Sequence, residues 1–120
     1  TNFEKETKNM ELIEMSKNVN KKKAYQLTHA MQTRKVQDAI DSVLPVSAWV
    51  RYNDIDTTTG EAKEVVVIES EGEIFGTISK TFIREFVDIL QAFGEDDDLA
   101  IKVVQGTSKA GRKFVSCEIV

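Results

Sequence analysis

The sequence predicts an α+β, mainly β domain in which strands surround one strong helix. Residues 79–94 carry apolar side chains at steps of three and four, which is the spacing of one apolar stripe along a helix. Three strand-like runs precede this helix and two follow it. That order is typical of a five-stranded OB-like barrel with a helix between strands three and four. A different α+β sheet with helices on one face is the alternative.

The helix expected over residues 79–94 has recognisable signals at both ends. Ser79 can accept hydrogen bonds from the first free backbone amides, and Gly94 suits the left-handed turn that closes many helices. Its apolar stripe needs a covering layer, which the strands on either side can supply. Residues 33–43 predict a weaker, N-terminal helix with Thr33 as its cap.

Five strands are expected, at residues 46–53, 64–69, 73–78, 99–105 and 113–120. The first alternates apolar and polar side chains, as a half-buried strand does. The second is a continuous apolar run, which indicates cover on both faces. Residues 54–63 link strands one and two, and residues 106–112 link strands four and five. In an OB-fold these two loops border the surface that binds oligonucleotides.

The first 24 residues differ in composition from the rest of the chain. They are polar and rich in Lys, Glu and Asn, and their apolar residues are too sparse for a strong stripe. We expect a flexible or frayed arm over residues 1–24, ending in the basic run at residues 21–23. A single OB-like domain then occupies residues 25–120.

Length and composition restrict the class of protein. A chain of 120 residues suits one domain, and the single cysteine, Cys117, gives no sign of an oxidising compartment. No apolar run approaches the roughly 20 residues of a membrane span. We therefore expect no membrane association and a cytoplasmic location.

The net charge of −4 is spread unevenly along the chain. Residues 1–60 hold nine Lys/Arg and eight Asp/Glu, whereas residues 61–120 hold seven and twelve, so the two halves carry +1 and −5. Much of the acidic excess is local, in residues 61–73 and in the run 95–98. An acidic total argues mildly against nucleic acid, but net charge does not exclude a basic groove.

The sequence offers no constellation of residues for catalysis. His29 is the single histidine, so a histidine-rich metal site is excluded, and Cys117 is on the apolar side of a predicted strand. No glycine loop has the spacing that cradles phosphates, and residues 96–98 lack the ligand pattern of a calcium loop. The sequence therefore predicts a protein that is not an enzyme and that needs neither a cofactor nor a metal.

Signals for nucleic-acid binding are stronger. Trp49 and Arg51 share a face of the first predicted strand, an arrangement that suits base stacking beside phosphate attraction. Residues 108–113 (SKAGRK) bring three cations together at a hairpin tip. For the aromatic residues, a place in the core is the alternative. The predicted nucleic-acid-binding residues are the aromatic Trp49, Phe75 and Phe114 and the basic Arg51, Lys63, Lys109, Arg112 and Lys113.

A family resemblance is carried by three stretches, KKKAYQLTHA at 21–30, GEIFGTISKTFIREF at 72–86 and VVQGTSKAGRKFVSCEI at 103–119. They resemble small single-stranded-DNA-binding proteins of phages of Gram-positive bacteria, and the likeness extends from residue 23 to residue 120. It implies a non-enzymatic replication protein that coats displaced single strands. The contacts it implies are Trp49, Lys109, Arg112, Lys113 and Phe114. The acidic surface and the internal position of run 95–98 depart from the family's pattern.

Two functions remain in view from the sequence. The first is a non-enzymatic phage-type single-stranded DNA-binding protein of replication or recombination, with RNA as an alternative ligand. The second is a phage or mobile-element protein-interaction module whose acidic surface binds or inhibits a host protein. A host or replication protein is therefore a candidate partner, and exposed strand edges would allow a homo-oligomer.

Overall fold

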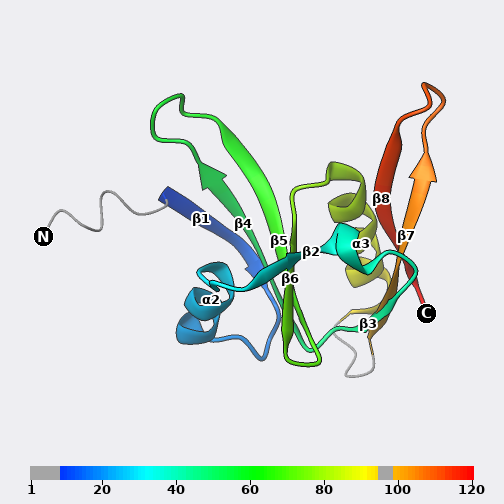
Figure 1. Ribbon diagram of the computed structural model, residues 1–120. Helices are drawn as coiled ribbons and strands as arrows, with labels where there is room; N and C mark the ends of the chain where they lie inside the picture. The colour runs from blue at the N-terminus through cyan, green and yellow to red at the C-terminus, as the bar shows by residue number, and fades with distance from the viewer. Residues whose placement is uncertain (1–8, 95–98) are drawn as a thin grey trace, which may run out of the picture.

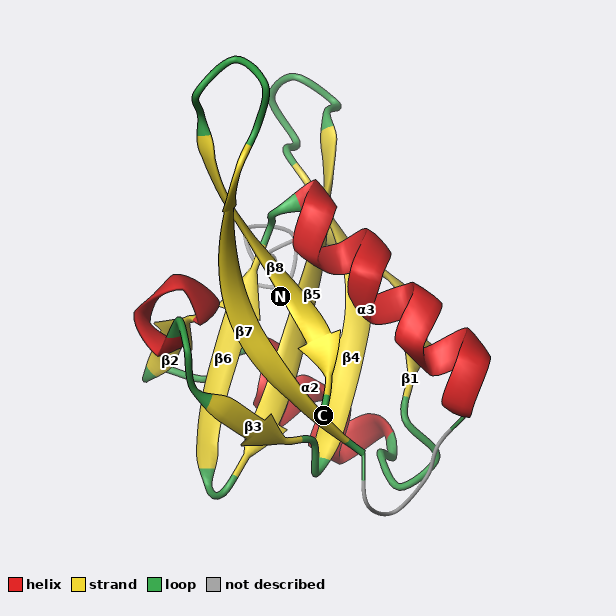
Figure 2. Cartoon of the chain, turned by 90° about the vertical axis from the view of Figure 1, so that its right-hand side faces the viewer, coloured by secondary structure: helices red, strands yellow, loops and turns green. Residues whose placement is uncertain are grey.

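The computed structural model describes residues 9–94 and 99–120. Two β-sheets flank helix α3 (Lys80–Phe93), which lies between them (Figure 1). Each sheet extends a long hairpin toward the same end of the molecule, and a view turned by 90° shows the same arrangement (Figure 2). The two hairpins and the helix between them determine where a ligand can bind.

The larger sheet has five strands in the order β1-β4-β5-β6-β2. Neighbouring strands are antiparallel, except that β2 runs parallel to β6. The β4–β5 hairpin forms the longest ladder, from the pair Ala48 and Glu69 to the pair Ile55 and Ala62. The strands are β1 (Asn9–Met15), β2 (Thr33–Lys35), β4 (Ala48–Ile55), β5 (Ala62–Ser70) and β6 (Glu73–Thr77).

The smaller sheet has three antiparallel strands in the order β3-β7-β8. These strands are β3 (Val43–Pro45), β7 (Ala100–Thr107) and β8 (Lys113–Ile119). A 3-10 helix, η1 (Val36–Ala39), connects the larger sheet to β3. The β7–β8 hairpin extends beyond the end of β3, so its outer part has no further strand beside it.

Helix α3 is capped at both ends as the sequence predicts. The Ser79 side chain accepts a hydrogen bond from the Phe82 amide at 3.3 Å, and Gly94 has a φ of 67° where the helix ends. The apolar stripe enters the main core, where Phe82 and Phe86 are fully buried together with residues of both sheets. Burying one side chain of this kind contributes about 1.5–3 kcal/mol. The helix therefore holds the two sheets together.

A second core lies on the opposite face of the larger sheet. Helix α2 (Lys21–Thr28) covers that face with Ala24 and Leu27, which pack with Val50 and Tyr52 of β4. Because the main core contacts the other face, β4 is buried on both sides. This double cover fixes the position of the aromatic residues on β4.

The predicted α+β, mainly β class is confirmed, and the bounds of the five predicted strands and of α3 differ from those observed by at most two residues. The closed OB-like barrel is not confirmed. In the described part of the chain, β7 and β8 pair with each other and β7 pairs with β3, whereas no hydrogen-bonded ladder joins the two sheets. Helix α3 occupies the space between the sheets in place of that closure.

The N-terminal third differs most from the expectation. The helix predicted over residues 33–43 is wrong, because β2, η1 and the start of β3 occupy that range. Val36 and Ala39 are buried three residues apart, which fits the tighter 3-10 turn. Residues 9–15 and 21–24, expected in a flexible or frayed arm, form β1 and the first turn of α2.

Two sequence predictions concern residues that the structure does not describe. The first part of the expected arm, residues 1–8, and the acidic run 95–98 lie outside the described residues. The division into an arm and a domain over residues 25–120 stays a prediction.

Candidate nucleic-acid interface

The tips of the two long hairpins lie on either side of the start of α3 (Figure 1). The side chain of Ser79, which caps the helix, donates a hydrogen bond to the carbonyl oxygen of Val115 in β8 at 3.3 Å. This bond fixes the helix start close to Lys113, two residues earlier in β8. The basic residues of the β7–β8 hairpin and of α3 are thus brought to one end of the molecule.

The β7–β8 hairpin ends in three exposed cations, Lys109, Arg112 and Lys113, which we call the basic tip. Hydrogen bonds from Ser108 N to Arg112 O at 2.8 Å and from Gly111 N to Ser108 O at 2.9 Å fix its turn. Gly111 has a φ of 83°, a conformation that favours glycine. Within residues 9–94 and 99–120, none of the three cations makes an ion pair, so all three can contact phosphate.

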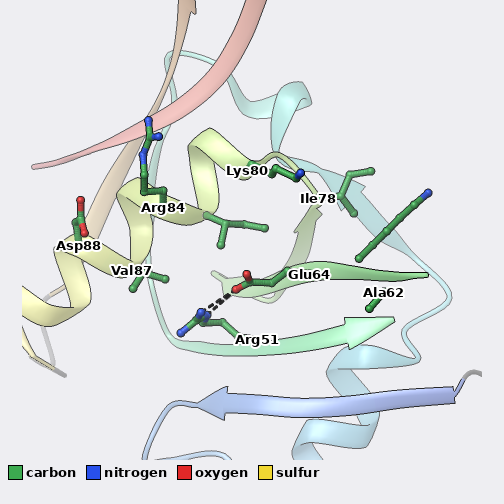
Figure 3. Close-up of a pocket in the computed structure, with 10 residues that line it drawn as sticks. Arg51, Ala62, Glu64, Ile78, Lys80, Arg84, Val87 and Asp88 are labelled. Atoms are coloured by element: carbon green, nitrogen blue, oxygen red, sulfur yellow. Dashed lines mark hydrogen bonds and ion pairs between the residues drawn. The ribbon is translucent and has the colours of Figure 1, made fainter. Parts of the chain in front are cut away.

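A groove of about 580 Å³ lies between the β4–β5 hairpin and α3, and we call it the α3 groove (Figure 3). Lys63 and Lys80 line it, and neither has an ion-pair partner among the described residues. Arg84, also in the lining, is 69% exposed and reaches its neighbour Glu85 only at 3.8 Å. The exposed Ile78 adds an apolar surface beside Lys80.

Arg51 lies in the α3 groove, but each of its three guanidinium nitrogens already donates a hydrogen bond to a carboxylate. Its guanidinium contacts Glu14 of β1 at 2.8 Å and Glu64 of β5 at 2.8 Å and 3.0 Å. The side chain is only 17% exposed. The two carboxylates flank it on neighbouring strands, so it joins β1, β4 and β5 (Figure 3). This geometry indicates a structural role where the sequence predicted a phosphate contact.

The stacking role predicted for Trp49 needs correction, because Trp49 is only 4% exposed. Its ring meets Phe86 of α3 edge-on, with ring centroids 6.0 Å apart. Trp49 and Arg51 do share a face of β4, as the alternation predicts, but α3 covers that face. Trp49 therefore belongs to the main core.

Of the other two predicted aromatic contacts, one is buried and one is half-exposed. Phe75 is only 2% exposed, and the guanidinium of Arg34 lies 5.3 Å from its ring centroid. Phe114 is half-buried on β8, directly across from Gly106 of β7. It directly follows Lys113 of the basic tip in β8. Among the three, Phe114 alone has a surface that a base could stack on.

Comparison with known proteins assigns the chain to a protein family. Residues 16–120 match the family described as phage single-stranded DNA-binding protein of the phi29 type. The chain belongs to this family. Similar curated proteins are each named single-stranded DNA-binding protein and come from Bacillus phage phi29 and Bacillus phage PZA. Each is 28% identical over 83 residues, which cover 65% of this chain and 67% of the relative. No solved structure matches the chain significantly.

The two hairpin tips of this family member differ in charge. The loop between β4 and β5 carries Asp54, Asp56 and Glu61 beside Lys63, around a hollow of about 290 Å³. Lys63 lies opposite Asp54 in the register of the β4–β5 ladder. The sequence predicted that both loops border the site, whereas the β7–β8 hairpin carries the three cations of the basic tip and the start of α3 adds Lys80 and Arg84.

Sequence reasoning missed several accessible residues of this family member. Lys80 and Arg84 follow the cap of α3 and line the α3 groove, and the guanidinium of Arg84 points away from Arg51 (Figure 3). The sequence did indicate that both side chains are accessible, because both fall outside the apolar stripe of the helix and follow the end of a predicted strand. Tyr25 was also missed, although its ring is 63% exposed on α2.

Two further structural findings concern the described part of the chain alone. No described helix is long and apolar enough to cross a membrane. No group of three or more His, Cys, Asp or Glu side chains in that part could hold a metal ion.

Proposed function

We propose that this chain is a non-enzymatic single-stranded DNA-binding protein that acts in the replication or recombination of phage DNA. The family match over residues 16–120 supports this function. The observation that carries it in the structure is a set of cations without ion-pair partners in the described region, gathered on the β7–β8 hairpin and at the start of α3. The relatives are phage proteins, so the proposed place of action is the host-cell cytoplasm.

In the proposed binding mode, the sugar-phosphate backbone passes the basic tip and continues along the α3 groove. Lys109, Arg112 and Lys113 neutralise phosphates at the tip. Lys63 and Lys80 do so in the α3 groove, and the exposed Arg84 does so beside it on α3. Single-strand binding of this kind combines a basic track with aromatic stacking, and it discriminates little between bases. The half-exposed ring of Phe114, next to Lys113, offers the stacking surface.

The acidic total of the chain is compatible with this function because charge acts locally. At 0.15 M salt the Debye length is about 8 Å, so a phosphate at the basic tip interacts mainly with the nearest charges. The acidic β4–β5 loop belongs to the other hairpin. Repulsion from Asp54, Asp56 and Glu61 would keep the strand on the α3 side of Lys63.

The test is a titration of a fluorescently labelled oligo-thymidine, followed by anisotropy at two salt concentrations. We expect saturable binding that weakens steeply with salt, because phosphate neutralisation releases counterions. A duplex of the same sequence should bind more weakly, and an oligo-uridine tests RNA as the alternative ligand. Absence of binding to single-stranded DNA at low salt would refute the proposed function.

The remaining sequence predictions stay predictions. A host or replication protein partner and a homo-oligomer are consistent with a coating protein, and pull-down and sedimentation measurements test them. The protein-interaction module is the outcome to pursue if oligonucleotides do not bind, with the acidic residues 61–73 as the surface to mutate.

A further inference from the structure

Helix α2 presents a pair of stacked rings to the surface. The rings of Tyr25 and His29 lie 4.1 Å apart at an interplanar angle of 14°. Tyr25 is 63% exposed, which makes it the most exposed aromatic ring in the described part of the chain. The spacing of four residues puts both rings on one side of the helix. An accessible ring held flat by a partner is suited to accept a nucleic-acid base.

The helix that carries this pair is firmly attached to the sheet. Ala24 and Leu27 are buried in the second core, and the Thr28 hydroxyl donates to the Ala24 carbonyl at 2.9 Å. On the other flank, Lys23 Nζ contacts Glu69 of β5 at 2.7 Å. The ring of Tyr25 is therefore presented by a fixed backbone.

Two exposed lysines accompany the stacked rings. Lys21 and Lys22 precede Tyr25 by four and three residues, so the helix brings them to the same side. Within the described ranges neither lysine makes an ion pair. The combination of a stacked ring and free cations repeats, on α2, the chemistry that the basic tip and Phe114 offer.

A second groove, of about 490 Å³, lies on the α2 side of the larger sheet. It is lined by Thr28 of α2, by Arg34 and Lys35 of β2 and by Ile78. Ile78 also lines the α3 groove, so the two grooves meet at this residue. At the other end of this groove, the hydroxyl of the lining residue Thr28 lies 3.0 Å from Nδ1 of His29.

We propose that the Tyr25–His29 pair is a second base-stacking platform for single-stranded DNA, with Lys21 and Lys22 contacting the adjoining phosphates. The strand that passes the basic tip continues over Ile78 and through the second groove to α2. This inference rests on the proposed function and extends it, because it makes the binding site longer than the hairpin end alone.

The test compares the affinity and the salt dependence of oligo-thymidine binding in matched variants. Tyr25→Leu should weaken binding about fivefold or more, since a stacked base is lost, while the salt slope stays unchanged. The double variant Lys21→Gln/Lys22→Gln should lower the slope by about 1.4. Tyr25→Phe, which keeps the ring, and Phe93→Leu, which removes another exposed ring, should both bind like the wild type.

A direct readout on the wild-type protein does not depend on the folding of variants. Photo-crosslinking with an iodouracil-substituted oligonucleotide, followed by peptide mapping, should label the peptide that contains Tyr25. Wild-type affinity for Tyr25→Leu, or crosslinks confined to the β7–β8 hairpin and α3, would overturn the α2 platform and leave the proposed function standing. A wild-type protein that binds no single-stranded DNA would overturn both.

Discussion

Phe114 occupies the space directly above Gly106 on the neighbouring strand. A Cβ atom placed on Gly106 would lie 2.4 Å from Cζ of Phe114 and 2.7 Å from Cε1, closer than atoms can approach. The two residues are paired in the β7–β8 register, so glycine makes room for the ring across the ladder. The position of the half-exposed Phe114 ring therefore depends on the absence of a side chain at Gly106.

We predict that Gly106→Ala displaces the ring of Phe114. Overpacking of this kind costs typically 1–3 kcal/mol, and urea denaturation measures it. Single-strand affinity should fall as well, because the ring no longer lies beside Lys113. Adding Phe114→Leu to Gly106→Ala should recover much of the lost stability. If Gly106→Ala is as stable as the wild type, the close packing of these two residues is refuted.

Two arginines in the α3 groove should respond differently to substitution. Arg51 is nearly buried and bound by Glu14 and Glu64, so Arg51→Gln should lower the free energy of unfolding by about 1–3 kcal/mol. Its effect on the salt slope should be small. Arg84 is largely exposed, so Arg84→Gln should leave stability within about 0.5 kcal/mol and reduce the salt slope by about 0.7. The opposite pattern would reassign the phosphate contact to Arg51.

The single tryptophan should be insensitive to bound DNA. Trp49 is buried against Phe86, so neither acrylamide nor a stacking base can reach its ring in the folded protein. We expect little change in its fluorescence when oligo-thymidine saturates the protein, while anisotropy of the labelled oligonucleotide reports binding. Strong, saturable quenching of Trp49 would contradict its place in the main core.

Cys117 should make the protein less stable at alkaline pH. Burial, with a smaller contribution from Glu85 and Glu118, raises the pKa of its thiol from 9.0 to about 12. Between these values the unfolded chain releases the proton and the folded chain retains it, so the free energy of unfolding falls as the pH rises from 9 to 12. Cys117→Ala should show a shallower decline over this range. Equal declines in both proteins would refute the contribution of this thiol.

The sequence predicted α3 and the strands around it because local patterns determine them. The spacing of Phe82, Phe86 and their neighbours specifies a helix. Ser79 and Gly94 mark its two ends. The alternation along β4 correctly placed Trp49 and Arg51 on one face. Alternation does not tell which face is covered, and here the two cores cover both faces, so the surface role of Trp49 could not be judged.

Other features depend on contacts between distant segments. Strand β1 pairs with β4 through a register shift between Leu12 and Glu14, so its apolar residues follow no simple alternation. The pairing of β7 with β3 depends on β3, a strand of three residues that local patterns do not reveal. The basic tip, in contrast, was predictable. Its cations are close together in a glycine-bounded hairpin loop, where no packed surface is near enough to bury them.

The most direct test of the account is the salt dependence of oligo-thymidine binding by the triple variant Lys109→Gln/Arg112→Gln/Lys113→Gln. With three phosphate contacts removed, the slope of log affinity against log salt should decrease in magnitude by about 2. Lys102→Gln, a cation on β7 outside the basic tip, serves as the control and should keep the wild-type slope. A triple variant with the wild-type slope and affinity would contradict the assignment of the β7–β8 hairpin to the DNA interface.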